Sequence, residues 1–392
     1  MNDTMMKDQA DDLFPIGYHK VHPIKIIDYQ LNRWYSLGFY ELSDIKILGA
    51  NIKGIDDWKP KMIEMADHKL KHGEKLAAAM YYRGAEFFTM PDDPDKYKLY
   101  QKFRHFFYQS SIVNSEDCKY IPYDNGFIPA MRYAAKGKKT ETLLIFGGFD
   151  SFMEEFCLIA QTFTKRGIEV ICFEGPGQGE PLKDYGLKMI IDWEKPTKAV
   201  LDHFNLEEAS LMGISMGGWW AIRAAAFEPR ITKVIALGVG YDYLEILPKW
   251  GKKLLLFFMK FKGFMNHMAR IKMKLIPQER WSINNLMHLT GAKTPMDASQ
   301  IILQMNKENI ASEKVTQDVL LLSGAKDHFI PVKMHHLQVK ALKNAQSVTD
   351  HIFTKKDAAE DHCMVGNMSL AINTITAWLE LKTKSKNETD YL

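Results

Sequence analysis

A serine flanked by glycines lies at a strand-to-helix junction, in Gly213-Ile214-Ser215-Met216-Gly217. The apolar run ASLM precedes the motif, and the helical stretch GGWWAIRAAAFEP follows from it. A sharp turn at such a junction crowds the backbone, and glycines on both sides relieve the crowding while the serine stays exposed at the head of a helix. The pattern predicts that Ser215 is a nucleophile.

A serine at neutral pH needs a base and an acid that orients the base, and both are expected downstream in the order acid, then histidine. Asp327 lies in LLLSGAKDHFIP, directly after an apolar run that is typical of a strand. His362 lies in AAEDHCM, after the last predicted strand. We predict that His362 is the base and Asp327 the acid, with Glu360 and Asp361 as the alternatives for the acid.

Acyl transfer also needs hydrogen-bond donors for the oxyanion that develops on the attacked carbonyl. The backbone N–H of Met216, the residue after the nucleophile, is expected to be one donor. The second donor is expected in the glycine-containing loop GGFD, residues 147–150, which follows the apolar run TLLIF. We predict the N–H of Phe149, with that of Gly148 as the alternative.

Short apolar runs separated by glycine-containing turns and helical stretches begin at about residue 119 and indicate parallel strands with crossover helices. Six runs are predicted strands: residues 142–146, 168–173, 209–213, 233–238, 318–323 and, more weakly, 349–354. The carboxyl ends of such strands meet at one edge of the sheet, where site residues gather. The sequence therefore predicts an α/β fold with a doubly wound, mostly parallel sheet.

Two further regions have helical spacing without strands. The predicted organisation is a helical N-terminal lid region at 1–115, a first part of the core at 116–239, an inserted helical cap at 240–312 and a second part of the core at 313–392. The cap is predicted because about 80 residues between two strands exceed an ordinary connection. Both helical regions are rich in aromatic residues or methionine, so we expect them to cover a substrate pocket above Ser215.

The composition excludes several functional classes. With 46% hydrophobic and 25% charged residues and a net charge of +3, the chain is typical of a globular protein and too weakly basic for a nucleic-acid binder. No Cys/His cluster has metal-ligand spacing and no phosphate-loop motif is present, so no metal or cofactor is expected. The four scattered cysteines, the acidic N-terminal stretch without a signal sequence and the lack of a membrane-spanning run predict a cytoplasmic protein.

The motifs GGFDSFMEEF, FEGPGQGEP, GISMGGWWA, SGAKDHFIP and AEDHCM, on a helical N-terminal region, resemble those of the α/β-hydrolases that cleave carbon–carbon bonds in 1,3-dicarbonyl compounds. This family includes dihydroxypseudooxynicotine hydrolases, fungal enzymes that shorten naphthopyrone polyketides, and bacterial chain-shortening hydrolases of type II polyketide anthraquinone pathways. The resemblance covers most of the chain. It implies the α/β-hydrolase fold and carries the catalytic triad of the family onto Ser215, Asp327 and His362.

The resemblance implies hydrolysis of a β-diketo substrate, such as a polyketide chain or intermediate, by acyl-enzyme chemistry. A carboxylesterase or thioesterase would use the same three residues and is the alternative. A hydrolase-fold protein that binds a ligand or partner without catalysis is a third hypothesis. The sequence leaves open the substrate's ring system, whether the substrate is free or carrier-bound, and whether the chain forms a homodimer.

Residues 248–274 form a basic segment with eight Lys and Arg residues, no acidic residue, and interleaved Leu, Phe and Met. The basic residues are Lys249, Lys252, Lys253, Lys260, Lys262, Arg270, Lys272 and Lys274. Such a segment can bind an acidic protein or an anionic membrane surface, or can be a solvated face of the cap. For an enzyme that shortens polyketides, the expected acidic partner is an acyl carrier protein.

Overall fold

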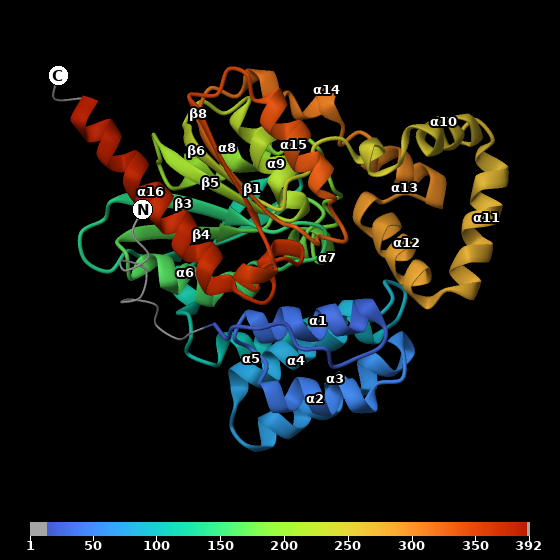
Figure 1. Ribbon diagram of the computed structural model, residues 1–392. Helices are drawn as coiled ribbons and strands as arrows, with labels where there is room; N and C mark the ends of the chain where they lie inside the picture. Colours follow the sequence, from blue (N-terminus) through green and yellow to red (C-terminus); the bar gives the residue numbers. More distant parts are fainter. Residues whose placement is uncertain (1–13, 390–392) are drawn as a thin grey trace.

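The computed structural model describes residues 14–389, with an eight-stranded sheet at its centre (Figure 1). The strands are β1 (Cys118–Tyr123), β2 (Gly126–Tyr133), β3 (Glu141–Phe146), β4 (Ile168–Phe173), β5 (Ala209–Ile214), β6 (Ile231–Leu237), β7 (Asp318–Gly324) and β8 (Ser347–Phe353). The acidic N-terminal stretch that lacks signal-sequence features lies, up to residue 13, outside the described residues.

The strands lie in the order β1-β2-β4-β3-β5-β6-β7-β8. All neighbours from β4 to β8 are parallel, whereas β1, β2 and β4 pair antiparallel. The prediction of a doubly wound, mostly parallel sheet is confirmed. The β1–β2 hairpin at one edge was not among the predicted strands. Its two-residue connection, Asp124-Asn125, is followed by Gly126, and Asp124 has a positive φ of 52°.

Both faces of the sheet are covered by helices, which explains why the central strands are continuous apolar runs. Leu143 and Ile145 of β3 belong to one core, with residues of α6 (Cys157–Thr164) and α16 (Met368–Thr389). Leu144 and Phe146, which point to the opposite face, belong to the other core. That core contains residues of α8 (Glu194–His203) and α9 (Met216–Ala225) and the end of α15 (Val332–Ala341).

Five helices precede the sheet and lie together on one side of it (Figure 1). They are α1 (Lys25–Ser36), α2 (Leu42–Asn51), α3 (Ile55–Lys71), α4 (Lys75–Phe88) and α5 (Asp95–Tyr108). Every residue of α4 from Ala78 to Phe88 is buried, as expected for a helix that is packed on all sides. The core of these helices is continuous with that of the α6 and α16 face of the sheet.

The segment between β6 and β7 forms a second group of helices beside the sheet (Figure 1). It contains α10 (Lys249–Phe258), α11 (Lys262–Leu275), α12 (Pro277–Thr290), α13 (Pro295–Ile302) and α14 (Lys307–Ile310). Trp281 of α12 joins this group to α4: its Nε1 donates to the carbonyl oxygen of Phe87 at 2.8 Å, and its ring stacks on that of Phe87. None of the helices within residues 14–389 is both long and apolar enough to cross a membrane.

A buried ion-pair network joins the N-terminal helices to the loop after β3. The Arg83 side chain is 1% exposed and contacts Glu155 at 2.8 Å and Glu86 at 2.6 Å. Arg83 also donates to the carbonyl oxygen of Asp150, and Arg33 of α1 contacts the second carboxylate oxygen of Glu155 at 2.5 Å. Two arginines from different helices therefore compensate one fully buried carboxylate, which fixes the helices relative to this loop.

Replacing Arg83 with methionine is expected to lower the free energy of unfolding by about 3–5 kcal/mol, because it removes a partner from buried carboxylates. Urea-induced unfolding would measure the change. As a control, Lys59→Met removes a more exposed ion pair with Asp93 and should cost no more than about 1 kcal/mol. Equal losses for the two variants would contradict the structural role assigned to Arg83.

Candidate active site

Ser215 lies in a strained turn between β5 and α9. Its φ of 62° and ψ of −125° are sterically unfavourable for a residue with a Cβ atom. Hydrogen bonds hold the turn, from the N–H of Ser215 to the carbonyl oxygen of Leu237 at 2.7 Å and from that of Gly218 to Ser215 at 2.9 Å. A Cβ atom on Gly213 would overlap the carbonyl oxygen of Gly217, so the glycine is needed for close packing.

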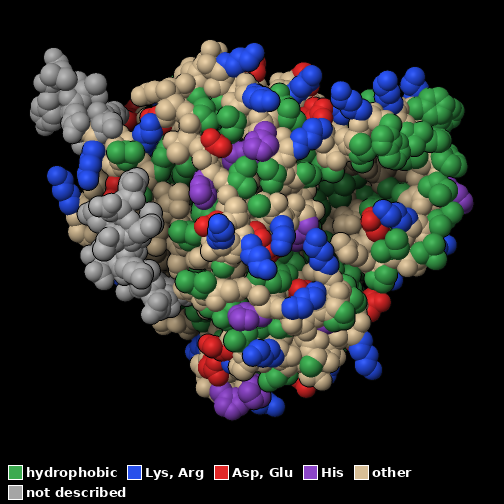
Figure 2. All heavy atoms as spheres, in the orientation of Figure 1, with side chains coloured by type: hydrophobic (Ala, Val, Ile, Leu, Met, Phe, Trp, Pro, Cys, Tyr) green, Lys and Arg blue, Asp and Glu red, His purple; other side chains and the backbone are tan. Residues whose placement is uncertain are grey.

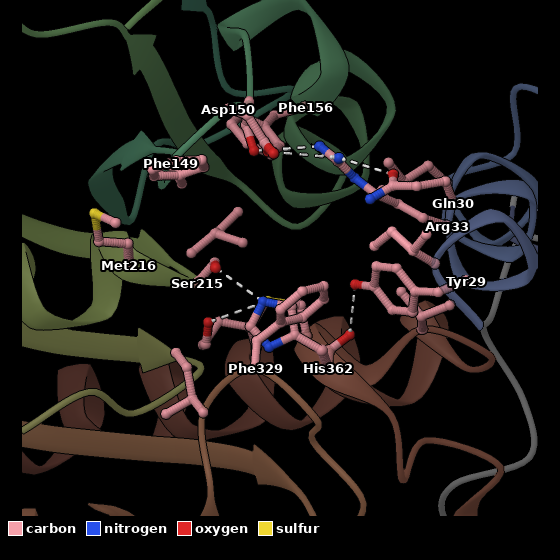
Figure 3. Close-up of a pocket in the computed structure, with 18 of the residues that line it drawn as sticks. Tyr29, Gln30, Arg33, Phe149, Asp150, Phe156, Ser215, Met216, Phe329 and His362 are labelled. Atoms are coloured by element: carbon pink, nitrogen blue, oxygen red, sulfur yellow. Dashed lines mark hydrogen bonds and ion pairs between the residues drawn. The ribbon is translucent and has the colours of Figure 1, made fainter. Parts of the chain in front are cut away.

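The structure brings the three residues predicted for catalysis into contact (Figure 3). The Nε2 atom of His362 lies 2.8 Å from the Oγ of Ser215, and its Nδ1 lies 2.6 Å from a carboxylate oxygen of Asp327. The alternative acid Glu360 instead pairs with Lys326 at 2.8 Å. In the part of the chain that the structure describes, the carboxylate of Asp361 makes no hydrogen bond or ion pair with the ring of His362. Of the three candidate acids, only Asp327 contacts the histidine.

The surroundings of Asp327 and His362 favour the charged form of each. Burial by itself would raise the pKa of Asp327, but His362 and the N–H groups of Phe329 and Ile330 lower it below its ordinary value. Burial would lower the pKa of His362, but the Cys363 side chain and the Asp327 carboxylate raise it well above 6.5. As a carboxylate in contact with Nδ1, Asp327 is placed where it can orient the ring and stabilise an imidazolium.

The loop after β3 lies beside Ser215 because β3 and β5 are neighbours whose connections leave the sheet in opposite directions. A Cβ atom on Gly148 would lie 2.8 Å from the nitrogen of Met216, so the loop and the serine turn are in close contact. Gln178 donates to the carbonyl oxygens of Gly147 at 2.8 Å and Gly148 at 3.1 Å. Because N–H and C=O of a trans peptide point in opposite directions, the N–H of Phe149 points away from Gln178.

Gln178 belongs to the segment FEGPGQGEP, residues 173–181, which is one of the motifs that carry the family resemblance. The side chain of Gln178 holds the loop after β3 through these two hydrogen bonds. No residue of the segment 173–181 is among those that line the cavity at Ser215. The N–H groups of Met216 and Phe149 make no hydrogen bond with any residue in the described part of the chain. They remain the predicted donors to an oxyanion.

A partly open, mainly apolar cavity of about 300 Å³ lies over Ser215. Residues of both helical additions line it, including Ile26 of α1, Leu37 directly after α1, and Trp281 of α12. Phe149 and Phe329 add apolar surface from loops at the sheet edge, and Met216 adds apolar surface from the start of α9 (Figure 3). Ser215 therefore faces a covered cavity whose wall combines the N-terminal helices and the inserted helices.

The wall contributed by α1 carries polar groups that face Ser215 across the cavity (Figure 3). Tyr29, Gln30 and Arg33 lie on the same side of the helix as Ile26. The hydroxyl of Tyr29 donates to the carbonyl oxygen of His362 at 3.2 Å, and Arg33 lies 3.7 Å from the carboxylate of Asp150. Burial raises the pKa of Asp150 despite the nearby arginines.

The sequence prediction did not include this polar wall. The spacing of the polar residues with Ile26 was available in the sequence as one side of a helix. Neither their types nor their spacing indicated that this side of the helix faces Ser215, because the contact is made between distant parts of the chain.

Substituting Gly213 with alanine is expected to destabilise the protein by about 1–3 kcal/mol and to reduce activity strongly, because the added methyl group must displace the serine turn. Urea unfolding and turnover by the folded fraction would measure the two effects. Gly263→Ala is the control, since a Cβ atom there meets nothing within 4 Å. If both variants keep parental stability and activity, the packing requirement at Gly213 is wrong.

The pH dependence of kcat/KM should report the protonation of His362, since only the neutral ring can accept the serine proton. Activity is expected to fall as the pH drops through a pKa above the ordinary 6.5. Asp327→Asn removes a carboxylate that raises this pKa, so the acid limb should move to lower pH while the plateau falls about 10³–10⁴-fold.

Glu360→Gln is the matched control for Asp327→Asn, and its pH profile should resemble that of the parent protein. A mild effect of Asp327→Asn combined with a severe effect at Glu360 or Asp361 would mean that the acid is misassigned.

Solved structures with similar architecture include 2,6-dihydroxy-pseudo-oxynicotine hydrolase and AbyA5. The first has a TM-score of 0.62 at 20% identity and covers 89% of this chain and 94% of its own. AbyA5 has a TM-score of 0.68 at 17% identity and covers 93% of this chain and 95% of its own. These similarities confirm the α/β-hydrolase fold and the predicted resemblance to the dihydroxypseudooxynicotine hydrolase group at the level of the fold.

Curated relatives include fungal hydrolases. The hydrolase acrC of Aspergillus aculeatus is 29% identical over 296 residues, which are 66% of this chain and 68% of that protein. The 20-hydroxy-prefusarin hydrolase FUS2 of Gibberella moniliformis is 29% identical over 280 residues, which are 65% of this chain and 66% of that protein. Residues 137–355, more than half of the chain, match the family model described as "Serine aminopeptidase, S33". The chain therefore belongs to this family of α/β-hydrolases and is a hydrolase.

Proposed function

We propose that this protein hydrolyses a carbon–carbon bond in a β-diketo substrate and thereby shortens a polyketide chain or intermediate. The observation that carries the proposal is the 2.8 Å contact of Ser215 Oγ with His362 Nε2 in a mainly apolar cavity. In this proposal residues 1–115 and 240–312 act as the two parts of a lid, over a core formed by residues 116–239 and 313–392.

The reaction begins with attack by the Oγ of Ser215 on a ketone carbonyl of the substrate. His362 accepts the serine proton at Nε2, and Asp327 holds the opposite ring nitrogen and stabilises the imidazolium. The negative charge that develops on the carbonyl oxygen is stabilised by the N–H groups of Met216 and Phe149, where one donor is worth about 2.7–4 kcal/mol. The nucleophile, the base and the oxyanion donors then surround one carbon atom, with the acid behind the base.

Cleavage of a carbon–carbon bond requires a leaving group that can hold the electron pair. A second carbonyl β to the attacked carbon meets this need, because the departing fragment is an enolate rather than a simple carbanion. Protonated His362 gives its proton to the enolate carbon and becomes neutral again. Water then attacks the acyl-enzyme with His362 as base, which releases a carboxylic acid and restores Ser215.

The residues that line the cavity favour a flat, mainly apolar substrate with a few oxygen atoms. Its aromatic and aliphatic walls suit one or more rings, as in a polyketide of the anthraquinone type. The polar groups of Tyr29, Gln30 and Arg33 lie across the cavity from Ser215, where we propose that they bind the second carbonyl or a ring hydroxyl. A bound enolate would be favoured by the positive charge of Arg33.

The relatives support a small-molecule substrate, since the names of two of them refer to prefusarin and pseudo-oxynicotine compounds. Cys118, Cys157, Cys172 and Cys363 are free thiols, which suits a reducing compartment. We therefore propose that the enzyme acts in the cytoplasm. No cofactor takes part in the proposed reaction.

Product analysis with an aryl β-diketone, benzoylacetone, tests the proposal directly. We expect the ketone and carboxylic acid of hydrolytic cleavage in equal amounts, with a higher kcat/KM than for an ester of matching size. Ser215→Ala should lower this activity at least about 10³-fold, because the covalent route is lost. Ser299→Ala, in helix α13 and outside the cavity lining, is the matched control and should keep parental activity.

Other outcomes distinguish the alternative functions. Faster cleavage of the ester or of a thioester, with no cleavage of the diketone, would identify a carboxylesterase or thioesterase that uses the same residues. Tight binding of substrates without turnover, unchanged by Ser215→Ala, would identify a binding protein. Intact mass spectrometry of His362→Ala with the diketone would show whether an acyl group stays on the protein.

A further inference from the structure

Helices α10 and α11, with their connection, form an outer edge of the molecule that we call the cap arm, residues 249–275 (Figure 1). No residue of the cap arm is buried, in contrast to α12, where Trp281 and Leu289 are buried. A helix that covers a protein core normally buries an apolar stripe. The cap arm therefore extends from the molecule without a core of its own.

The cap arm nevertheless has apolar stripes with helical spacing. In α10 the stripe is Trp250, Leu254 and Phe257, and in α11 it is Phe264, Met268, Ile271 and Leu275. Positions three or four residues apart share one side of a helix. All seven side chains are exposed, Trp250 by 71% and Leu275 by 75%.

An aromatic cluster connects the two stripes at the corner between the helices. The rings of Phe257 and Phe258 lie 5.5 Å apart, as do those of Phe257 and Phe261, and Phe258 lies 5.9 Å from Phe264. Figure 2 shows hydrophobic side chains gathered along α10 and α11 at one edge of the molecule. This continuous apolar surface needs a partner, since exposed patches of this kind mark interaction sites.

The charge of the cap arm is positive throughout. Of its eight basic residues, three pair with acidic residues outside the arm: Lys252 with Glu245, Lys262 with Asp297, and Lys272 with Glu279. The other five form no ion pair with any residue between 14 and 389. These five are Lys249, Lys253, Lys260, Arg270 and Lys274. The partner must therefore carry negative charge and also provide an apolar environment for large side chains.

We propose that the cap arm binds the surface of a membrane that contains anionic lipid. Amphipathic helices with Trp, Phe and Leu on one side and Lys or Arg on the other lie in the lipid interface, with the apolar side among the acyl chains. The phosphate groups of anionic lipids bind the free lysines. Both properties of the arm, its apolar stripes and its unpaired positive charge, are then satisfied by one partner.

Other partners satisfy only one property. A second copy of the chain, paired through the same surface, would bring like charges together. An acidic carrier protein would match the charge, as the sequence led us to expect, but a soluble acidic surface offers few large apolar contacts for the stripes. Carrier docking therefore remains a prediction that competes with the lipid proposal.

Lipid binding through the cap arm would place the membrane surface close to the wall of the active-site cavity. Helix α12 follows α11 after a single residue, and its Trp281 and Ser282 line the cavity over Ser215. If the proposed function holds, a flat apolar substrate that partitions into the lipid would be concentrated beside this wall. The binding itself does not depend on the proposed function, because it can be measured without turnover.

Co-sedimentation of the full chain with vesicles tests the proposal. We expect binding to vesicles of equal parts phosphatidylcholine and phosphatidylglycerol, little binding to phosphatidylcholine alone, and weakening of binding by salt. A charge variant, Lys249→Glu with Lys253→Glu, and an apolar variant, Trp250→Ser with Phe257→Ser, should each lower the partition coefficient at least about tenfold.

Matched controls lie on other exposed surfaces. Lys340→Glu with Lys343→Glu, at the end of α15, reverses the same charge, and Ile47→Ser on α2 removes an apolar side chain that is 52% exposed. Both controls should keep the parental partition coefficient. All substituted side chains are exposed, so thermal unfolding should be close to parental for every variant.

Several results would overturn the proposal. These are no binding to anionic vesicles, equal binding to both lipid mixtures, or an equal loss in the control variants. Dimerisation that the two cap-arm variants abolish, with no vesicle binding, would identify a second copy as the partner. Retention of the chain on an immobilised acyl carrier protein, lost in the charge variant and again without vesicle binding, would identify the carrier.

Discussion

The strained backbone of Ser215 is the constraint on which the rest of the site depends. A non-glycine residue in such a conformation costs on the order of 1–3 kcal/mol, so neighbouring contacts must hold it. The N–H of Ser215 bonds to β6, and a Cβ atom on Gly238 would lie only 3.2 Å from the Cα of Ser215. The sheet, the loop after β3 and the start of α9 together define the position of the serine Oγ, and His362 and Asp327 meet it there.

Local sequence patterns predicted the central strands of the sheet, because burial alone determines the types of their residues. Strands buried on both faces are continuous apolar runs, and the five strands of this kind, β3 to β7, are present where they were predicted. The more weakly predicted β8 is also present, as an edge strand with several exposed residues. The β1–β2 hairpin was missed because its strands are partly exposed and contain Pro122 and Pro129, which are unusual in the middle of a sheet. The contacts of Ser215, His362 and Asp327 follow from motifs at strand ends.

Residues whose importance depends on distant contacts could not be predicted in this way. Gln178 supports the loop of Gly147 and Gly148 from a different segment, and Arg83 meets Glu155 across 72 residues of sequence. A buried charge is improbable in isolation and becomes stable only when its partner is known. Neither residue lies in a local pattern that reveals its partner.

Arg33 has two structural roles. Its side chain lines the cavity, and its guanidinium group also compensates the charge of the buried Glu155 carboxylate. A change at Arg33 that suits a new substrate would also weaken the attachment of α1 to the core. Ser282 of α12 lines the same cavity, and among residues 14–389 its hydroxyl bonds only within its own helix. Stability therefore constrains Arg33 more than Ser282, so the wall of the cavity can change at Ser282 with a smaller loss of stability than at Arg33.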